Sequence, residues 1–554
     1  MIIIRMLRPA PSINGIALAA LLAAALVAAP LLSVALNVFV GGTGATWAHL
    51  ADTVLPDYVV SSLVLCAVVA IGTAALGVGA AWLVTRHEFA GRAAFEWLLV
   101  LPLAMPAYVI AYAYTDLLQY VGPVQSALRR AFGWSHGDYW FPDVRSLGGA
   151  AAMFVLVLYP YVYLLARTAF LERAGGMIEV GRSLGLTPWR SFVRLSLPLA
   201  RPAIAAGVAL ALMETLADYG TVAYFGVQTF TTGIYRAWFS LGDRAAAAQL
   251  SLALLAFVVA VLALERASRG RSRYADATLR GRSVARVPLR GVRALLALAA
   301  CALPLLLGFV LPALVLALLA SSTELLPLQH FAILAGNSVR LAGLTAAAAV
   351  ALALLIAYAA RAQRGTAMQA AHRLAGFGYA LPGTVIAVGV LIPVTRLDHA
   401  LAAALSSWAG IDPGLLFTGG IAALVYACVV RYLTAALQSV DAGLARITPS
   451  MEQASRSLGL TAGQTLARVH LPLLRGSVLT AALLVFIDVM KELPATLVMR
   501  PFNFDTLATS AYTLASDERL AEAATPALAI VAVGLGPMVL LCRRIARGSA
   551  LPQT

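Results

Sequence analysis

Four carboxylic acids lie inside otherwise apolar runs of this chain and are the residues best placed to do chemistry. They form two pairs, and the members of each pair are four residues apart, a spacing that places both carboxylates on one helix face. Ionisable groups at such depth normally face a bundle interior or an aqueous path. Carboxylate oxygens suit hard cations and organic cations alike, so the set is a candidate translocation pathway. The four residues are Glu214, Asp218, Asp488 and Glu492.

A structural role is the alternative for these acids. They would then pair internally, most obviously with Lys491, or cap the ends of broken helices. A conduit does not need a tight site, because the substrate must leave again. Tyrosines such as Tyr108, Tyr112 and Tyr114 lie where an aromatic belt would place them. We therefore assign no metal ligand from the sequence.

The two acid pairs belong to a long internal repeat. The sequence RSLGLT occurs at 182–187 and again at 456–461, and eleven of twenty positions are identical between 182–201 and 456–475 without a gap. The same offset of 274 residues relates Glu214 to Asp488 and Asp218 to Glu492. Before these segments, 104–106 aligns with 380–382 at an offset of 276. Self-similarity on this scale indicates a duplication.

The composition indicates a polytopic membrane protein. Hydrophobic residues make up 61% of the chain and charged residues only 12%, and a spanning helix needs about 20 apolar residues. We predict an all-α fold of about 12 transmembrane helices in two six-helix repeats. Six spans per half is an even number, so equivalent loops face the same side, as in a parallel repeat. The apolar runs lie near 13–38, 59–84, 95–119, 148–170, 203–226, 245–265, 291–320, 337–361, 373–395, 417–437, 476–498 and 524–545.

The net charge of +15 follows the arrangement expected of a membrane protein rather than of a nucleic-acid-binding protein. Lys491 is the only lysine, and the arginines fall mainly in alternate loops between spans. By the positive-inside rule these loops and both termini are cytoplasmic. We predict a first half at 1–265, a basic cytoplasmic linker at 266–290 that contacts anionic membrane lipid, and a second half at 291–554.

Each half carries a polar, arginine-rich loop, at 171–203 and 442–475. In the first loop a short helix from Glu179 would end at Gly185, a natural position for a glycine. Thr187 would cap a second helix that begins at Pro188. A repeated polar surface between spans indicates a repeated contact with a partner outside the membrane, whereas an amphipathic connector on the bilayer surface is the alternative. The residues expected to act in these loops are Glu179, Arg182, Gly185, Leu197 and Pro198, then Gln453, Arg456, Gly459, Leu471 and Pro472.

These loops resemble the "EAA" loop of permease subunits in binding-protein-dependent ABC importers, a type I permease fold. The family pattern has an acidic-Ala-Ala start, a glycine and a Leu-Pro. The first loop lacks both alanines after Glu179, and the second has Gln453 at the acidic position. The resemblance implies that each loop docks on one of two copies of a cytoplasmic ATPase. It also implies a periplasmic binding protein and a bacterial inner-membrane location.

A narrower resemblance, covering nearly the whole chain, is to the fused ferric-iron permeases. It rests on the segments 217–220 (ADYG), 229–235 (TFTTGIY), 491–497 (KELPATL) and 505–509 (DTLAT). The resemblance implies ferric iron as the substrate. Fused thiamine permeases share the two-halves layout, and sulfate, polyamine and phosphonate permeases share the loop type, so these substrates stay open.

The sequence contains no route to ATP binding by a P-loop. That motif requires Gly-Lys-Ser/Thr, and the only lysine, Lys491, is followed by Glu492 inside an apolar run. We therefore predict no enzyme activity and no cofactor bound by this chain, with ATP and Mg²⁺ held by the partner subunit. A secondary transporter driven by an ion gradient, with the acids as a proton relay, is the alternative from another class. A channel or assembly scaffold ranks below it.

Overall fold

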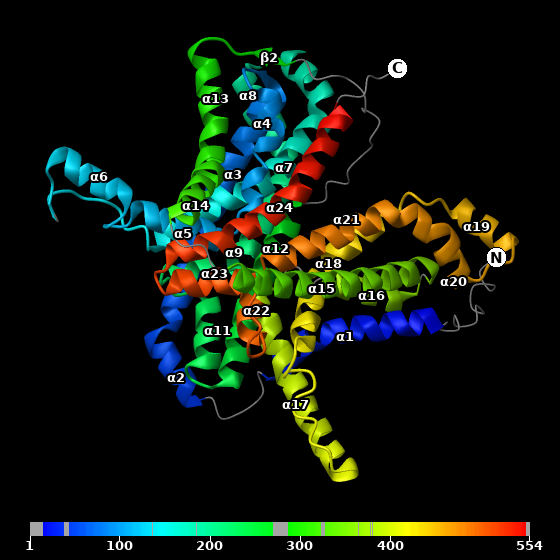
Figure 1. Cartoon of the computed structure of the whole chain (residues 1–554). Coiled ribbons are helices and arrows are strands. Elements are labelled where there is room, and N and C mark those ends of the chain that lie inside the picture. Colours follow the sequence, from blue (N-terminus) through cyan, green and yellow to red (C-terminus); the bar gives the residue numbers. More distant parts are fainter. Residues whose placement is uncertain are drawn as a thin grey trace. The chain divides into compact units, whose positions relative to one another are not determined.

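The computed structural model describes residues 15–37, 44–135, 137–183, 185–269, 286–322, 327–363, 365–376, 378 and 381–549. Over these residues the chain is helical apart from turns and two short strands, β1 (His87–Glu88) and β2 (Val287–Pro288), which pair in parallel (Figure 1). Within the described residues, ten helices are long and apolar enough to span a membrane, and a pair bent by 90° (Arg92–Ala104 with Ala107–Phe132) makes up to eleven. The all-α polytopic fold is confirmed.

The chain forms two compact units, and each draws on both sequence halves. Unit 1 comprises 1–46, 234–252 and 329–509, and unit 2 comprises 47–233, 253–328 and 510–554. Unit 2 thus combines the middle spans of the first half with the first and last spans of the second, and unit 1 shows the reciprocal arrangement. The division of the chain at the 266–290 linker comes from the sequence repeat. As a statement of domain organisation, it stays a prediction.

Unit 2 is built around three packed helices, α3, α7 and α9, which contact one another pairwise. The first helices of the second half, α13 and α14, pack against α3, α4, α5 and α24. Its elements are α2 (Gly44–Thr53), α3 (Leu55–Arg86), α4 (Arg92–Leu98), η2 (Leu101–Ala104), α5 (Ala107–Leu118), α6 (Pro123–Phe132), α7 (Leu147–Ser183), α8 (Pro188–Ser191), η3 (Phe192–Ser196), α9 (Leu197–Ala217), α10 (Gly220–Tyr224), α13 (Val292–Leu305), η4 (Leu306–Val310), α14 (Leu311–Ser322) and α24 (Leu520–Ser549).

Unit 1 pairs α18 with α21, and α1 packs along α16 and α17. Five helices, α2, α11, α12, α15 and α23, have residues in both units. The remaining elements are α1 (Gly15–Asn37), α11 (Phe230–Phe239), α12 (Arg244–Arg269), α15 (Leu328–Ala362), α16 (Thr366–Ala375), α17 (Gly383–Ala409), α18 (Ala422–Leu444), α19 (Pro449–Ser457), α20 (Ala462–Thr465), η6 (Leu466–His470), α21 (Leu471–Met490), α22 (Pro494–Met499) and α23 (Leu507–Ser516).

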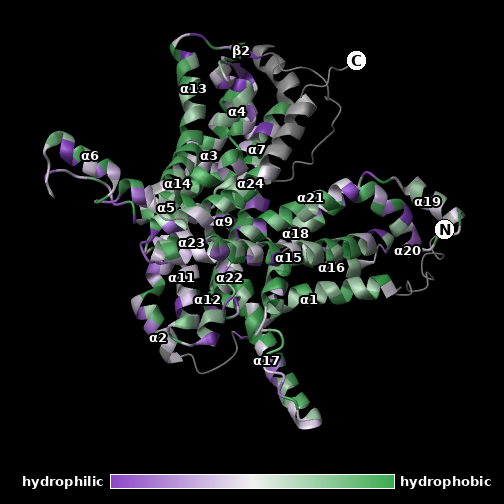
Figure 2. Cartoon of the chain, in the orientation of Figure 1, coloured by the Kyte–Doolittle hydropathy of each residue, from purple (hydrophilic) through white to green (hydrophobic). Residues whose placement is uncertain are grey.

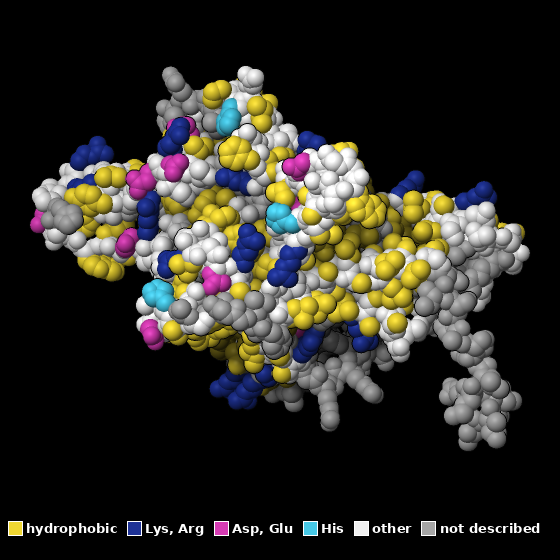
Figure 3. Space-filling model, turned by 90° about the horizontal axis from the view of Figure 1, so that it is seen from below, with side chains coloured by type: hydrophobic (Ala, Val, Ile, Leu, Met, Phe, Trp, Pro, Cys, Tyr) yellow, Lys and Arg dark blue, Asp and Glu magenta, His cyan; other side chains and the backbone are white. Residues whose placement is uncertain are grey.

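The outer faces of the helices are apolar, as lipid contact requires. On α1 the leucines at 18, 22, 26, 32 and 36 are exposed, whereas Ala20, Ala24 and Val27 on the opposite face are buried. Figure 2 shows hydrophobic residues along α1 and α13, whereas α6 carries both hydrophobic and hydrophilic residues. On the face seen in Figure 3, hydrophobic side chains form broad areas between scattered charged ones. Since lipid tails are as apolar as leucine, close packing rather than the hydrophobic effect must hold the helices together.

Glycines provide that close packing. A Cβ atom at Gly77 of α3 would lie 2.7 Å from Val162 Cβ and 2.9 Å from the Tyr159 carbonyl oxygen of α7. A Cβ atom at Gly207 of α9 would lie 2.7 Å from Val162 Cα. The backbones of α3 and α9 therefore both approach α7 at the level of Val162, which fixes the three-helix core that carries the first loop.

The structure corrects the third span of each half. The run at 95–119 is not one helix, because Pro102 and Pro106 interrupt the hydrogen-bond ladder and the chain turns by 90° between α4 and α5. The run at 373–395 begins as a spanning helix only at Gly383, since α16 ends at Ala375. The expected spans at 203–226 and 476–498 end at Ala217 and Met490.

Replacing Gly77 by alanine is expected to destabilise unit 2 by about 1–3 kcal/mol, the usual cost of overpacking. The added methyl group would contact the backbone of α7, which cannot move away as a side chain can. Gly79→Ala on the same helix is the control, because a Cβ atom there meets nothing within 4 Å. Thermal unfolding of the purified protein in detergent measures the difference. Equal stability of the two variants would contradict the close approach.

Candidate functional site: paired loops and membrane-embedded charges

The first loop is an extension of two long helices. Helix α7 runs without a break to Ser183, so the short helix expected from Glu179 is the end of a 37-residue helix. Gly185 then has φ of +64°, which confirms the turn expected at this glycine. Thr187 accepts hydrogen bonds from Arg190 N (3.4 Å, to Oγ1) and from Ser191 N (2.8 Å, to the carbonyl oxygen), as an N-cap does. The side chains of Glu179 and Arg182 lie outside the described residues.

The second loop has the same turn but a separate first helix. Helix α18 ends at Leu444, where Arg361 donates to the carbonyl oxygens of Leu444 and Ile447, both at 2.5 Å. After α19, Gly459 has φ of +78°. Thr461 and Gln464 then form a reciprocal capping box: each accepts a hydrogen bond from the backbone N–H of the other. Gln453 and Gly459 are exposed, and the Arg456 side chain lies outside the described residues.

A one-turn π-helix precedes the Leu-Pro sequence in each loop. It spans Phe192–Ser196 in the first loop and Leu466–His470 in the second. Pro198 and Pro472 carry no N–H, so a regular α-helix would leave a carbonyl oxygen one turn earlier unpaired. The wider turn accommodates the proline, and each loop helix continues directly into a span. Leu-Pro therefore marks an irregular turn within a continuous helix rather than a break before the membrane.

Both loops present large apolar side chains outward. Trp189 is 68% exposed in the first loop, and Leu458 is 80% exposed in the second. Beneath the first loop, Phe192 packs against Trp82 with ring centroids 4.2 Å apart, and Phe170 completes the cluster at 5.7 Å from Trp82. Each loop therefore has one large apolar side chain that a partner could cover.

A charged pair ties each loop-bearing span to a neighbouring short helix, with the charges reversed between halves. In the first half Arg167 of α7 donates to Glu96 of α4 at 2.5 Å. In the second half Asp441 of α18 lies 3.0 Å from His372 of α16. Arg167 corresponds to Asp441 at the offset of 274, and Glu96 to His372 at the offset of 276. The charged pair is present in both halves, but the positive and negative residues have exchanged helices. This indicates that the contact between the two helices matters more than the identity of either residue.

The second of these pairs borders a pocket and contains a titratable histidine. A cavity of about 370 Å³ is lined by Arg361, His372, Asp441 and Leu444 among others. The hydrogen bond to Asp441 raises the pKa of His372 above its ordinary value of 6.5, against the opposing effect of burial. Protonated His372 therefore stabilises this contact.

Contrary to the expectation from their spacing, the two acids of each pair do not share one helix face. Helix α9 ends at Ala217, and Asp218 has an extended backbone (φ −71°, ψ 136°), so Asp218 cannot lie on the helix face of Glu214. The chain breaks at this point because Asp218 caps the next short helix, α10. Its carboxylate accepts hydrogen bonds from Thr221 N (2.8 Å), Thr221 Oγ1 (3.2 Å) and Val222 N (3.4 Å).

In the second half Glu492 caps α22 in the same way. It accepts bonds from Ala495 N (2.9 Å), Thr496 N (2.9 Å) and Thr496 Oγ1 (2.6 Å). Here a cation is added: Arg431 of α18 lies 3.0 Å from the fully buried Glu492 carboxylate. Lys491 lies 3.0 Å from Asp488. The structural alternative of internal pairing and helix capping is thus what the second half shows.

The first half has no cation at the equivalent positions. The position of Arg431 is occupied by Val157, and that of Lys491 by Ala217. Glu214 and Asp218 are partly exposed and lie close enough to interact electrostatically. Within the described residues no three His, Cys, Asp or Glu side chains are grouped as a metal site. Arg431, Glu96 and Arg167 were not predicted as functional residues, although a charged residue inside a predicted span was a usable signal in each case.

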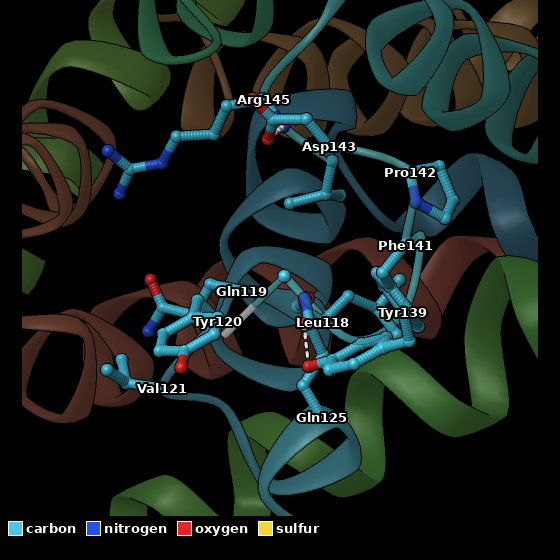
Figure 4. Close-up of a pocket in the computed structure, with 12 residues that line it drawn as sticks. Leu118, Gln119, Tyr120, Val121, Gln125, Tyr139, Phe141, Pro142, Asp143 and Arg145 are labelled. Atoms are coloured by element: carbon cyan, nitrogen blue, oxygen red, sulfur yellow. Dashed lines mark hydrogen bonds between the residues drawn. The ribbon is translucent and has the colours of Figure 1, made fainter. Parts of the chain in front are cut away.

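A second pocket lies where α5 gives way to α6 (Figure 4). This cavity of about 530 Å³ is lined by residues from Leu118 to Arg145. Gln125 donates to the Leu118 carbonyl oxygen at 2.8 Å and accepts from the Tyr139 hydroxyl at 2.6 Å. Arg145 extends away from these residues and contacts Tyr224 and Glu518 instead.

Duplicated halves, continuous loop-to-span helices and charges within the spans define a polytopic membrane transport protein. Comparison with known proteins shows what the chain is similar to. Residues 74–274 match the family described as binding-protein-dependent transport system inner membrane component. The match includes the first loop.

Individual relatives agree with this match. The chain is 26% identical over 494 residues to the Fe(3+)-transport system permease protein FbpB 2 of Haemophilus influenzae, covering 87% of this chain and 88% of the relative. It is 28% identical over 150 residues to the molybdenum transport system permease protein ModB of the same species, covering 27% of this chain and 62% of the relative. It is 29% identical over 183 residues to the sulfate transport system permease protein CysT of Escherichia coli, covering 32% and 63%.

Removing Arg431 is expected to cost about 3–5 kcal/mol of stability, because Glu492 would remain as an uncompensated buried charge. The variant Arg431→Met should unfold at a clearly lower temperature than wild type in detergent. The double variant Arg431→Met with Glu492→Gln should recover part of the loss, since the glutamine keeps an oxygen for the α22 cap. A double variant no more stable than the single one would show that the charge is not the cause.

The His372–Asp441 contact is expected to weaken as the pH rises. Because its pKa is raised in the folded protein, protonated His372 contributes stability that is fully present below pH 6.5 and is lost as the pH rises through the raised value. Thermal unfolding of wild type and His372→Gln across this window measures the difference, which should shrink toward high pH. Glu96→Gln is the control, since the Glu96–Arg167 pair contains no histidine. A constant difference for His372→Gln would contradict the assignment.

Proposed function

We propose that this chain is the membrane-spanning permease of an ATP-driven importer that takes up ferric iron from a periplasmic binding protein. The observation that carries the proposal is the end-to-end similarity to a permease named for Fe(3+) transport, which extends over both halves of the chain. The molybdenum and sulfate permeases match less than a third of the chain each.

The charges within the spans favour a cation over an oxyanion. Glu214 and Asp218 are two carboxyl groups with no lysine or arginine among their described hydrogen-bond and salt-bridge partners. A molybdate or sulfate ion near them would meet repulsion in a medium of low dielectric constant. Ferric iron, thiamine and polyamines are cations, and ferric iron is the one that prefers oxygen ligands most strongly.

ATP hydrolysis in this proposal belongs to two copies of a cytoplasmic ATPase that bind the two loops. Trp189 and Leu458 supply exposed apolar contacts for a docking groove. Each loop leads through its π-turn into one long helix, and Trp189–Ala217 is a single apolar helix of 29 residues. Closure of the ATPase pair would move both loops together, and these helices would carry the movement to Asp218 and Glu492 at their far ends.

The location and orientation follow from the same proposal. The chain is a multi-pass membrane protein, and we place it in the bacterial inner membrane with the loops, the linker and both termini in the cytoplasm. The arginine distribution supports this orientation. The membrane-embedded acids would otherwise fit a proton-driven secondary transporter, but such a carrier requires no duplicated docking loops.

Reconstitution of the permease with its ATPase and binding protein in proteoliposomes tests the proposal. Uptake of ⁵⁵Fe(III) should require ATP on the side of the membrane that holds the ATPase, and it should not respond to a proton gradient. Molybdate, sulfate and thiamine should neither be taken up nor compete. Uptake driven by a proton gradient without ATP would establish the secondary transporter instead.

Replacing Gly185 and Gly459 together by valine is expected to uncouple ATP hydrolysis from transport. A β-branched residue at positive φ costs about 1–2 kcal/mol or more at each turn and would displace the docking loops. ATPase copurification and ATP-dependent uptake should both fall. Gly463→Ala is the matched control in the second loop, because that glycine has no positive φ and no neighbour within 4 Å of its Cβ position. Unchanged copurification in the double variant would exclude the loops as docking sites.

A further inference from the structure

A group of oxygen-bearing side chains surrounds Asp218 in unit 2. Tyr112 of α5 stacks edge to face on Tyr224 of α10 with centroids 4.8 Å apart, and Tyr108 lies 5.8 Å from Tyr112. Tyr219 is paired with Tyr512 at 5.8 Å. The Tyr112 hydroxyl interacts electrostatically with Asp218, Tyr512 and Tyr224. One carboxylate and several phenol groups therefore share a small region.

Tyr112 is the unusual member of this group. Its side chain is only 1% exposed, and its hydroxyl has no hydrogen-bond partner among the described residues. A buried hydroxyl without a partner costs about 1–3 kcal/mol. Tyr224 differs, because Arg145 lies over its ring and its hydroxyl is 3.5 Å from the guanidinium. Of these two stacked tyrosines, Tyr112 is therefore the one whose oxygen is available for a ligand.

The second half lacks this arrangement at the equivalent positions. Val388 replaces Tyr112, Leu493 replaces Tyr219 and Val498 replaces Tyr224. Its acids are neutralised, Glu492 by Arg431 and Asp488 by Lys491. The first half therefore offers two carboxyl groups without a described lysine or arginine partner and a phenol without a described hydrogen-bond partner. The second half offers two ion pairs instead.

We propose that Glu214, Asp218 and Tyr112 form a receiving site for a hard trivalent cation in the first half alone. The proposal rests on the proposed function, since it names where the imported ferric ion is first held by the permease. Two carboxylates and one phenolate carry three negative charges, which balance Fe³⁺, and all three ligand atoms are oxygen. Tyr112 releases its proton to water when the metal binds, and the oxidation state of the iron does not change.

The position of the site agrees with this role. Asp218 follows the last residue of α9, a helix of 21 residues that starts at the coupling loop, so about 31 Å separates the site from the loop. The partial exposure of Glu214 and Asp218 gives water or an ion access to the carboxylates. Three protein ligands leave coordination positions open, which lets the ion leave again.

Binding of Fe(III) nitrilotriacetate to the permease–ATPase complex in nanodiscs tests the site. The binding protein is omitted so that any signal comes from the membrane complex. Wild type should show the visible charge-transfer band of an Fe(III)–phenolate, and Tyr112→Phe should lose the band. Asp218→Asn and Glu214→Gln should weaken binding at least about tenfold. The side chain introduced by Asp218→Asn keeps an oxygen that can cap α10, so loss of folding is not expected.

Two matched variants make the result specific. Tyr159→Phe removes another buried hydroxyl without a described partner in unit 2, and it should leave the band intact. Asp488→Asn changes the equivalent of Glu214 in the second half, and it should leave the affinity unchanged. An unaltered band in Tyr112→Phe, or equal weakening by Asp488→Asn and Glu214→Gln, would overturn the proposal.

Uptake by the complete system separates this inference from the proposed function. If wild type takes up ⁵⁵Fe(III) with ATP and the variants Tyr112→Phe and Asp218→Asn take it up equally fast, the receiving site is wrong and the proposed function stands. If wild type takes up no iron with ATP, the proposed function itself fails. Slower uptake in both variants with normal ATPase copurification supports the site.

Discussion

A charge or a broken helix end inside a membrane must be satisfied by the protein itself, and both halves of this chain meet that requirement with one acidic residue. Asp218 and Glu492 each follow the end of a long helix and accept the free N–H groups of the next short one. Without such a cap the interruption would expose unpaired backbone groups to hydrocarbon. The cap therefore permits the break, and the break is what distinguishes these spans from simple membrane anchors.

Close helix packing gives the same elements their rigidity. Gly77 and Gly207 bring α3 and α9 against the backbone of α7, and Gly443 brings α18 against Ser477 and Leu474 of α21. In each half the helix that carries the capped end also begins at the exposed loop. A helix fixed by backbone contacts transmits displacement along its length better than one held only by flexible side chains. In each half the surface loop therefore lies at one end of a closely packed helix, and the intramembrane acid follows its other end.

The sequence predicted the class of fold well and the details of its interruptions poorly. Apolar runs located about half of the spans to within a few residues, and the turns at Gly185 and Gly459 were correctly placed because glycine readily adopts the positive φ found there. The bends at Pro102–Pro106 and after Ala217 were missed, since hydrophobicity continues through them. Whether an acid lies on a helix or beyond its end depends on backbone hydrogen bonds that periodicity does not record.

The partners of the acids were equally hidden, because they come from distant parts of the chain. Arg431 and Glu492 are 61 residues apart, and only the packing of α18 beside α21 and α22 brings them together.

The internal repeat becomes informative once such contacts are known. Both loops keep the same glycine, threonine and Leu-Pro, whereas the surroundings of the acids differ: Arg431 against Val157, and Val388 against Tyr112. Selection for a two-fold symmetric partner would preserve the loops in both halves, but a single ion needs ligands only once. The surroundings of the acids differ between the halves, whereas the loops stay alike. This is the pattern expected if one symmetric ATPase pair binds both loops and the ion is held in only one half.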